Sequence, residues 1–568
     1  MTTERQGNGP TPPRRSVETS RPSVETGHRG GVDTVTRKPF ERKPIAHVIH
    51  GSLLEGLVAR LADDADVEDL RVGRFVVVEG ARNRFFSSVH DVKLEAANPA
   101  VLKAPPPELD LARTSLAGTQ TYVTVELKPK LMLERSDNEV HPVKTIPGHF
   151  SRVAEASDED VALVFGEPGE TMMRLGSPLE MESAVCLDLE RYVERSNGVF
   201  GKTGTGKSFL VRMVLAGLVR SRAAVNLVFD MHDEYGWESY DEETKRSAPS
   251  LKQAFDSEVL IFTLDPASSA RRKVTPDYEV HIAFRDIEAD DLALLARELN
   301  VKEAQIPAMH RLYETLGPNW IVEFLAMAPG DELLAFANDH GLHAGSLQAL
   351  HRNLARLRKL PFLKESGTDD SVERIVKALL NGKHVVLEFG GQTSLLAYML
   401  VANILTRRIH GRWRTEKESA SADGRHDHPP QLTITIEEAH KFLSPEAAGQ
   451  SIFGEIAREM RKYNVGLLVV DQRPSGIDDE IRSQLGTRIV ASLDDERDQQ
   501  AALAGLPDAG AMRILLNNLE PKKQVLLTGY AMPMPIVVET RDYYGFAKAM
   551  KRSAATGPEN GKPDLWER

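Results

Sequence analysis

The stretch Gly201-Lys202-Thr203-Gly204-Thr205-Gly206-Lys207-Ser208 has the residue types and the spacing to bind the phosphates of a nucleotide. It fits the phosphate-loop pattern G-x-x-x-x-G-K-[ST]. The three glycines let the backbone curl so that successive N–H groups point at phosphate oxygens. Lys207 can then reach the β- and γ-phosphates, and the Ser208 hydroxyl can ligate Mg²⁺. The predicted cofactor-binding residues are Gly201, Thr203, Gly204, Thr205, Gly206, Lys207 and Ser208.

Two adjacent carboxylates could supply the chemistry of hydrolysis. Glu437 and Glu438 follow the apolar stretch at residues 432–436, and γ-phosphate hydrolysis needs a metal contact and a group that orients the attacking water. We predict that Glu437 holds Mg²⁺, directly or through water, and that Glu438 polarises the nucleophile. The alternative is a pair of surface glutamates at a helix start, where the helix dipole favours them. His440 fits a capping or packing role as well as a catalytic one.

An amide and two arginines complete the set of candidate site residues. Gln472 follows the apolar stretch at residues 466–470, at the strand end where ligands bind in open α/β folds. Its side chain can sense the γ-phosphate or the water; alternatively it only ties down its own loop. Arg458 and Arg461 lie three residues apart on one expected helix, so we expect them to project on the same side. An arginine that completes a neighbour's site needs such an exposed placement.

A parallel sheet has to bring these residues together. Residues 223–229 form an apolar stretch after the phosphate loop and its helix, and strand, loop, helix and strand in that order make a βαβ unit. Only Val199 and Phe200 are plainly apolar before the loop, and they mark the first strand. We expect further strands at residues 384–389, 432–436, 466–470 and 488–493.

Helical patterns interrupt this sheet. Periodicity between about residues 287 and 380 predicts a helical insertion. One helix there carries Arg352, Arg356 and Lys359 on a single face, which is either solvated or a contact surface for DNA or a partner. A long helix is expected at residues 393–412, followed by a surface loop at residues 415–430.

The N-terminal part of the chain has a different pattern. Short strands are predicted at residues 73–80, 84–92 and 121–127, a spacing that favours a small β-barrel. The predicted fold is an α/β P-loop (RecA-like) parallel-sheet domain with a helical insertion, preceded by that barrel. The predicted boundaries are residues 1–44 for a disordered arm, 45–187 for the barrel, 188–545 for the ATPase domain with its insertion at about 287–380, and 546–568 for a C-terminal tail.

Composition limits the class of protein. The chain has 568 residues, of which 41% are hydrophobic, enough for two to four domains with real cores. Cys186 is the single cysteine, which excludes a disulfide framework and fits a cytoplasmic location. We expect no membrane association, because no apolar run approaches the roughly 18–20 residues of a membrane span, and no signal peptide at the polar start. The net charge of −12 leaves room for a local basic channel.

Five motifs in order resemble the HerA branch of the HerA/FtsK ATPases. The resemblance covers about residues 45–545 and implies a homohexameric ring that threads double-stranded DNA, with ATP bound between subunits. It implies an arginine finger, placed at Arg461, and a second interface arginine, placed at Arg195. It also implies that the barrel docks a NurA-type nuclease or, in antiphage operons, a nuclease or sirtuin-like effector. The motifs are residues 201–208, His232-Asp233-Glu234-Tyr235, Glu437-Glu438-Ala439-His440, Arg461-Lys462-Tyr463 and Gln472-Arg473-Pro474-Ser475.

Three functions remain open at this point. The first is an ATP-driven DNA translocase that works with a nuclease in DNA end processing or antiphage defence. The second is an ATP-binding assembly platform that organises an effector enzyme with little DNA translocation. Stimulation of ATP turnover by double-stranded DNA distinguishes these two. The third, a conjugation or division pump of the FtsK kind, is disfavoured because the sequence contains no membrane segment.

Overall fold

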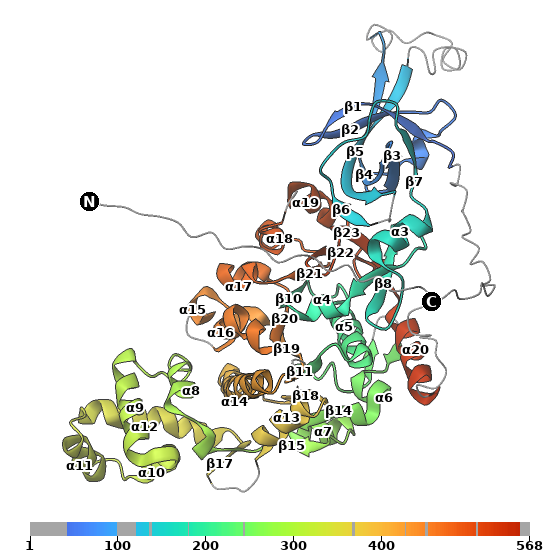
Figure 1. Ribbon diagram of the computed structural model, residues 1–568. Helices are drawn as coiled ribbons and strands as arrows, with labels where there is room; N and C mark the ends of the chain where they lie inside the picture. The colour runs from blue at the N-terminus through green and yellow to red at the C-terminus, as the bar shows by residue number, and fades with distance from the viewer. Residues whose placement is uncertain are drawn as a thin grey trace, which may run out of the picture. The chain divides into compact units, whose positions relative to one another are not determined.

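Two large β-sheets organise the chain from Pro44 onward (Figure 1). The computed structural model describes residues 42–98, 121–135, 139–179, 181–241, 245–365, 370–392, 394–425, 428–448, 452–506 and 509–556. Nearly all of the predicted N-terminal arm and the end of the predicted C-terminal tail lie outside these residues.

The first sheet closes on itself. Its strand order is β2-β1-β7-β3-β4-β5-β6, and β2 also pairs with β5, so that an antiparallel ring forms. Alternate residues such as Val76 and Val78 point into its core with Phe85, because successive side chains on a strand face opposite sides. The predicted barrel is confirmed. Its strands are β1 (Ala46–Ser52), β2 (Gly56–Leu61), β3 (Phe75–Glu79), β4 (Asn83–Ala96), β5 (Thr121–Glu134), β6 (Val140–Pro142) and β7 (Arg152–Glu155).

The second sheet has the order β15-β14-β18-β11-β19-β20-β10-β21-β22-β23-β8-β9. Neighbouring strands from β15 to β21 pair in parallel, and those from β21 to β9 pair antiparallel. The predicted α/β class is confirmed. The strands are β8 (Met172–Pro178), β9 (Val185–Asp188), β10 (Asn197–Phe200), β11 (Val225–Asp230), β14 (Val259–Thr263), β15 (Tyr278–Glu279), β18 (His384–Glu388), β19 (Leu432–Glu437), β20 (Val465–Asp471), β21 (Thr487–Val490), β22 (Gln524–Gly529) and β23 (Ile536–Thr540).

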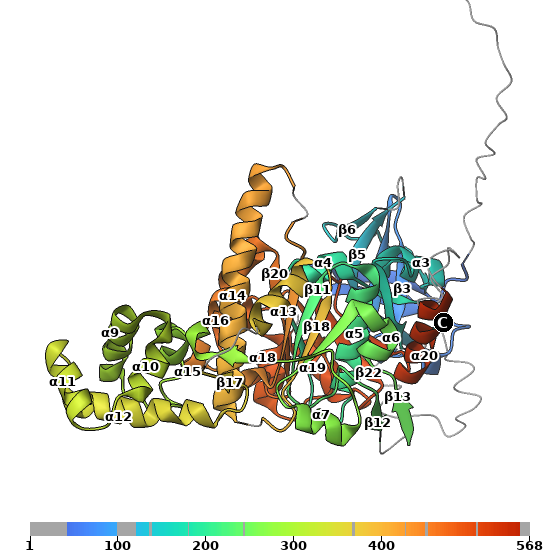
Figure 2. The ribbon, with the colours of Figure 1, turned by 90° about the horizontal axis from the view of Figure 1, so that it is seen from below.

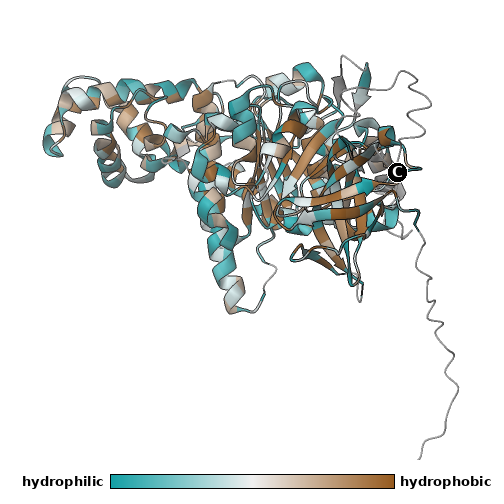
Figure 3. Ribbon diagram, turned by 90° about the horizontal axis from the view of Figure 1, so that it is seen from above, coloured by the Kyte–Doolittle hydropathy of each residue, from teal (hydrophilic) through white to brown (hydrophobic). Residues whose placement is uncertain are grey.

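Helices cover both faces of the parallel part of this sheet (Figure 2). Phe229 on β11 packs in the core under α13 (Ser371–Leu380), α14 (Leu395–Ala422) and α16 (Ile452–Glu459). Its neighbour Val228 packs in the core under α5 (Lys207–Ser221), α6 (Leu251–Phe255) and α20 (Tyr543–Thr556). Strands buried on both faces are mostly apolar, and the hydropathy colouring in Figure 3 shows this for the sheet.

The sheet boundary lies earlier in the chain than predicted. Strands β8 and β9 fall within the predicted barrel segment at residues 45–187, but β8 pairs with β23 and β9 pairs with β8. They therefore extend the second sheet. A period-two apolar pattern identifies a strand but does not say which sheet it joins, and this is why the sequence placed the boundary too late.

The predicted surface loop at residues 415–430 is wrong in its first half, because α14 continues to Ala422. Ion pairs between Arg412 and Glu416 and between Arg414 and Glu418 join successive turns of this polar segment. The indole N–H of Trp413 donates to the Pro430 carbonyl at 3.0 Å, which anchors the helix to the chain that returns from it. Within the parts of the chain that the structure describes, no helix has both the length and the apolar character needed to cross a membrane.

Helices also follow one another between β16 (Ile282–Ala283) and β17 (Leu363–Lys364), which pair in parallel. The predicted single basic face is wrong. Helix α12 ends at Leu354 and a 3-10 helix spans Ala355–Lys359, so Arg352, Arg356 and Lys359 do not share one α-helical face. The helices are α8 (Ala289–Ala293), α9 (Ile306–Leu316), α10 (Trp320–Ala326), α11 (Asp331–Asp339) and α12 (Ala344–Leu354).

Candidate functional site

The phosphate loop joins β10 to α5 and has the backbone that its glycines allow. Gly204 has φ +80° and Gly206 has φ +85°, in the left-handed region where a side chain is strained. Inside the loop, the Thr205 hydroxyl donates to the Lys202 carbonyl at 2.7 Å. The loop therefore ends at the N-terminus of α5, where free N–H groups and the helix dipole favour an anion.

Lys207 lies over this loop. Its Nζ donates to the carbonyls of Gly201 at 2.6 Å and Lys202 at 3.1 Å. Burial lowers the pKa of Lys207, and the charges of Glu438, Asp471 and other nearby carboxylates oppose that shift. The ammonium group is thus close to the carboxylates that end the neighbouring strands. Ser208, the next residue of α5, is partly exposed.

Four buried carboxylates form a row along the carboxyl edge of the sheet. Glu388, Asp230, Glu437 and Asp471 are the last residues of β18, β11, β19 and β20, which are neighbours in that order. None of the four is more than 6% exposed. Parallel strands bring their ends to one edge, and in α/β folds this edge binds the ligand. The row therefore places acidic groups next to the phosphate loop.

Glu437 is held by Tyr235, a residue to which the sequence gave no role. The Tyr235 hydroxyl donates to Glu437 Oε1 at 2.6 Å. The N–H groups of Glu234 and Tyr235 donate to Asp230 at 2.9 and 2.8 Å, which fixes the turn that carries the tyrosine. Burial raises the pKa of Glu437 to about 8 and that of Asp230 to about 6. A buried carboxylate of this kind is best ionised beside a cation.

The residues present fit Mg²⁺. Glu437 Oε2 is buried and has no hydrogen-bond partner among the described residues. In the same part of the chain, no group of three or more His, Cys, Asp and Glu residues could hold a metal alone. Mg²⁺ is usually bound through one or two carboxylates together with substrate phosphates rather than in a cage of protein ligands. Ser208 and Glu437 are a donor set of that kind.

Gln472 connects the phosphate loop to Glu438. Its Oε1 accepts from the Thr203 hydroxyl at 2.6 Å, and its Nε2 donates to the two Glu438 oxygens at 3.2 and 3.3 Å. Glu438 has φ +48°, a strained backbone conformation for a residue with a side chain. The structure thus brings together three residues that the sequence singled out separately.

His440 is tied to the acidic row. Its backbone N–H donates to Asp471 at 2.6 Å and its Nδ1 lies 3.0 Å from the same carboxylate. The hydrogen bond to Asp471 raises the pKa of His440. Of the two roles considered for His440, these contacts favour the packing role.

An ion pair at the far end of the row was missed. Arg272, the last residue of α7 (Pro266–Arg272), donates to Glu388 Oε2 at 2.7 Å and lies 3.5 Å from Asp233. Burial raises the pKa of Glu388 to about 7 although Arg272 opposes the shift. The sequence did carry one signal, since Glu388 directly follows the apolar residues Val385, Val386 and Leu387 at the end of its strand.

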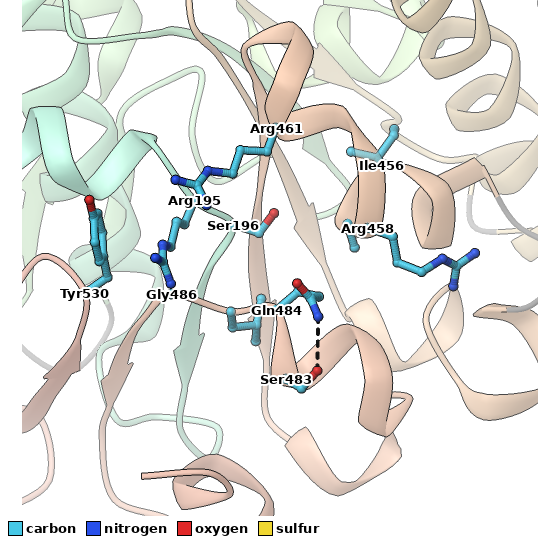
Figure 4. A pocket seen from close by; sticks show the side chains of 11 residues that line it. Arg195, Ser196, Ile456, Arg458, Arg461, Ser483, Gln484, Gly486 and Tyr530 are labelled. Atoms are coloured by element: carbon cyan, nitrogen blue, oxygen red, sulfur yellow. Dashed lines mark hydrogen bonds between the residues drawn. The ribbon is translucent and has the colours of Figure 1, made fainter. Parts of the chain in front are cut away.

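The predicted interface arginines line a cavity of about 270 Å³ (Figure 4). Arg195 precedes β10, Arg461 precedes β20, and Gly486, also in the lining, precedes β21, so the cavity lies at the amino edge of three adjacent parallel strands. No carboxylate is among the described residues that line it. The full lining is Arg195, Ser196, Ile456, Ala457, Arg458, Arg461, Ser483, Gln484, Leu485, Gly486 and Tyr530.

The expectation that Arg458 and Arg461 project on the same side is wrong. Arg461 extends toward Arg195, whereas Arg458 points away from both (Figure 4). Arg458 lies 3.6 Å from Glu480, and α16 changes to a 3-10 helix between the two arginines, at Met460–Tyr463. In the described chain, the Arg461 side chain forms neither a hydrogen bond nor an ion pair and is exposed.

The structure does not bring Arg195 and Arg461 to the phosphate loop. The loop follows the carboxyl end of β10, and Arg195 lies before its amino end. At about 3.3 Å per residue, the strand alone separates the two edges by about 13 Å. The two arginines therefore lie at the opposite edge of the sheet from their own phosphate loop.

The chain is similar to known proteins. A family model described as "Helicase HerA, central domain" matches residues 173–409. The DNA double-strand break repair helicase HerA of Pyrococcus furiosus is 24% identical over 462 residues, which cover 76% of this chain and 80% of that protein. The helicase of the same name from Saccharolobus solfataricus is 24% identical over 432 residues, covering 74% and 78%. The solved structure of VirB4 of Thermoanaerobacter pseudethanolicus has a TM-score of 0.42 and 14% identity, covering 66% of this chain and 98% of that one.

The matched region starts in the second sheet and includes the phosphate loop, two of the four carboxylates of the row, Asp230 and Glu388, and the first half of α14. The two helicases extend the similarity over about three quarters of the chain. Residues 173–409 therefore match the central domain of the HerA helicases, and about three quarters of the chain is similar to the two HerA helicases named above.

Proposed function

We propose that this protein is an ATP-driven double-stranded DNA translocase of the HerA type and that it works as a homohexameric ring. ATP is the substrate whose γ-phosphate water would attack, and Mg²⁺ would neutralise the charge of the phosphates. Lys207 and the N–H groups of the loop hold the phosphates. Ser208 and Glu437 would hold the metal, and the Tyr235 hydroxyl fixes the orientation of Glu437.

Glu438 orients the attacking water and accepts its proton. The carboxylate suits this role because it lies beside the loop, accepts from the neutral amide of Gln472 and has His440 Nδ1 at 3.8 Å. Gln472 also holds the Thr203 hydroxyl, so a movement of the phosphate loop is passed to Glu438 through one side chain. We propose that this connection couples phosphate binding to the position of the base.

The position of the cavity lined by Arg195 and Arg461, here called the arginine cavity, is the observation that supports a ring of subunits. Arg195 and Arg461 line a cavity without a carboxylate, at the sheet edge opposite their own phosphate loop. Two guanidinium groups without a counter-ion attract an anion. When subunits associate head to tail, the amino edge of one sheet meets the carboxyl edge of the next, and such a contact closes into a ring. Each subunit then supplies Arg461 as the finger for its neighbour's ATP.

The DNA substrate and the partner follow from the relatives and from the barrel. Two relatives are named as DNA double-strand break repair helicases, which supports double-stranded DNA as the track. In the part of the barrel that the structure describes there is no phosphate loop and no acid–base set, so we assign the barrel to the binding of a partner, a NurA-type nuclease or another effector of DNA end processing or antiphage defence. Leu54 in the β1–β2 turn is 89% exposed and Phe150 is 75% exposed, and we expect a bound partner to cover such apolar side chains.

ATP turnover measured with and without double-stranded DNA tests this function. We expect DNA to raise the rate of the native ring, and we expect the Glu438→Gln ring to stay slow with DNA present. Light scattering on the same samples reports the size of the assembly. A native ring whose turnover is unchanged by DNA would instead indicate the assembly platform, which organises an effector enzyme without moving DNA.

A further inference from the structure

The side chain of Arg195 lies flat against an aromatic ring. Its guanidinium carbon is 4.0 Å from the ring centroid of Tyr530, and both residues line the arginine cavity (Figure 4). Arg191 contacts the same ring at 4.8 Å. An arginine over an aromatic face is attracted by the ring quadrupole, and the stack restricts the rotamers of the arginine.

Tyr530 itself is held at both ends. Its backbone N–H donates to the Gly486 carbonyl at 2.8 Å, and its hydroxyl donates to Glu194 at 2.7 Å. The residue follows directly after β22, so a sheet strand fixes its backbone. The ring is therefore a rigid support rather than a mobile surface side chain.

Gly486 closes the other side of Arg195. A Cβ at this position would lie 2.7 Å from both Cβ and Cδ of Arg195, closer than real Cβ atoms come to other heavy atoms. The Gly486 N–H donates to the Ser196 carbonyl at 2.7 Å, and the Asn197 amide donates to the Arg195 carbonyl at 2.8 Å. Any side chain at residue 486 would push the arginine out of its place.

The contacts leave the charge of Arg195 without a counter-ion. Among the residues that the structure describes, its guanidinium forms no hydrogen bond and no ion pair, and its Nε is buried. A long side chain that is fixed before it meets an anion loses less conformational entropy on binding. The geometry thus prepares Arg195 to receive an anion without rearrangement, in contrast to the exposed Arg461.

We propose that Tyr530 and Gly486 are positioning residues that hold the Arg195 guanidinium ready for the phosphates of a nucleotide bound by the neighbouring copy of this chain. The proposal rests on the shared site described under Proposed function. Neither residue touches the nucleotide. Both act through Arg195, and this dependence can be measured.

The test compares kcat and KM for ATP in assembled rings that carry Tyr530→Leu, Tyr530→Phe, Arg195→Ala and the double change Tyr530→Leu with Arg195→Ala. In Tyr530→Leu, loss of the aromatic side chain is expected to lower kcat by roughly tenfold, the range of a partly desolvated cation–π contact. Little change in KM is expected. Tyr530→Phe keeps the aromatic ring beside Arg195 and is expected to retain most of kcat. In the Arg195→Ala background, Tyr530→Leu is expected to have no further effect.

Three results separate the outcomes. If Arg195→Ala lowers kcat and Tyr530→Leu does not, the positioning role is overturned while the shared site stands. If Tyr530→Leu lowers kcat equally in both backgrounds, it acts apart from Arg195 and the proposal is also overturned. If Arg195→Ala leaves kcat unchanged, the role of Arg195 in the proposed function fails as well. Light scattering and Tm show whether each variant folds and assembles. If Tyr530→Leu does not assemble, Gly486→Ala replaces it, because this change displaces the Arg195 side chain and keeps the Tyr530 side chain. The expected results are the same.

Discussion

Removing the Arg272 guanidinium, which neutralises the Glu388 carboxylate of the acidic row, is expected to destabilise the protein more than most single substitutions do. In Arg272→Met, Glu388 loses the guanidinium that donates to it at 2.7 Å. Glu388 is 0% exposed, so no water replaces the lost partner. Breaking a buried pair by removing one member costs roughly 3–5 kcal/mol, because a buried charge is left uncompensated.

The pH dependence of this loss has a defined sign. Burial already raises the pKa of Glu388 to about 7 beside Arg272, and removal of the guanidinium raises this pKa further. The unfolded chain ionises Glu388 near its ordinary pKa, so the folded variant is penalised wherever it must keep the proton. The difference in stability between Arg272→Met and the native protein is therefore expected to grow as the pH rises through about 7 toward about 9.

Urea unfolding followed by tryptophan fluorescence, at about pH 6 and about pH 9, measures this effect, because urea leaves ionic interactions unscreened. The control is the double change Arg272→Met with Glu388→Gln, which removes both charges and is expected to recover most of the lost stability. An Arg272→Met protein with native midpoints at both pH values would refute this reasoning. A double variant as unstable as the single one would also refute it.

Three further outcomes are expected. Lys207→Ala abolishes ATP hydrolysis and leaves the native circular dichroism spectrum, because its ammonium contacts loop carbonyls rather than the core. Glu438→Gln still binds ATP in a filter assay but turns it over about 10²- to 10⁴-fold more slowly, the usual contribution of a general base. Burial lowers the pKa of His384 from 6.5 to about 4. The free energy of unfolding of the native protein therefore falls by up to about 3 kcal/mol as the pH drops from about 6.5 to about 4. In His384→Gln, Tm is expected to lack this part of its dependence on acid pH.

The sequence could predict the parts of the site that depend on local spacing. The phosphate loop is contiguous, and its glycines must have the backbone that they show. Glu437, Glu438 and Gln472 each follow an apolar stretch, and the ends of parallel strands meet at one edge. The link through Thr203, Gln472 and Glu438 then follows from the sheet order, although no spacing in the sequence specifies a hydrogen bond.

Other features depend on contacts between distant segments and could not be predicted. Arg272 lies 116 residues before its partner Glu388, and Tyr530 stacks on Arg195 from another strand connection. Neither contact leaves a periodic pattern. The extension of α14 was missed because its second half has no apolar face, and anchoring by Trp413 and ion pairs replaces the packing that a helix pattern reports.

Rings assembled from two different inactive variants test the central claim, which is that each ATP site is shared and that the neighbouring subunit supplies its arginines. Arg461→Ala subunits keep the phosphate loop, and Lys207→Ala subunits keep the finger. In equal random mixtures, about a quarter of the interfaces receive both intact halves, because each interface draws one half from each neighbour.

We predict that mixing these two inactive proteins restores part of the ATP turnover, in proportion to that fraction. The measurement is the ATPase rate of the mixture after subunit exchange, compared with each parent alone. A mixture no more active than its parents, or an Arg461→Ala protein that is monomeric by light scattering and fully active, would contradict the account.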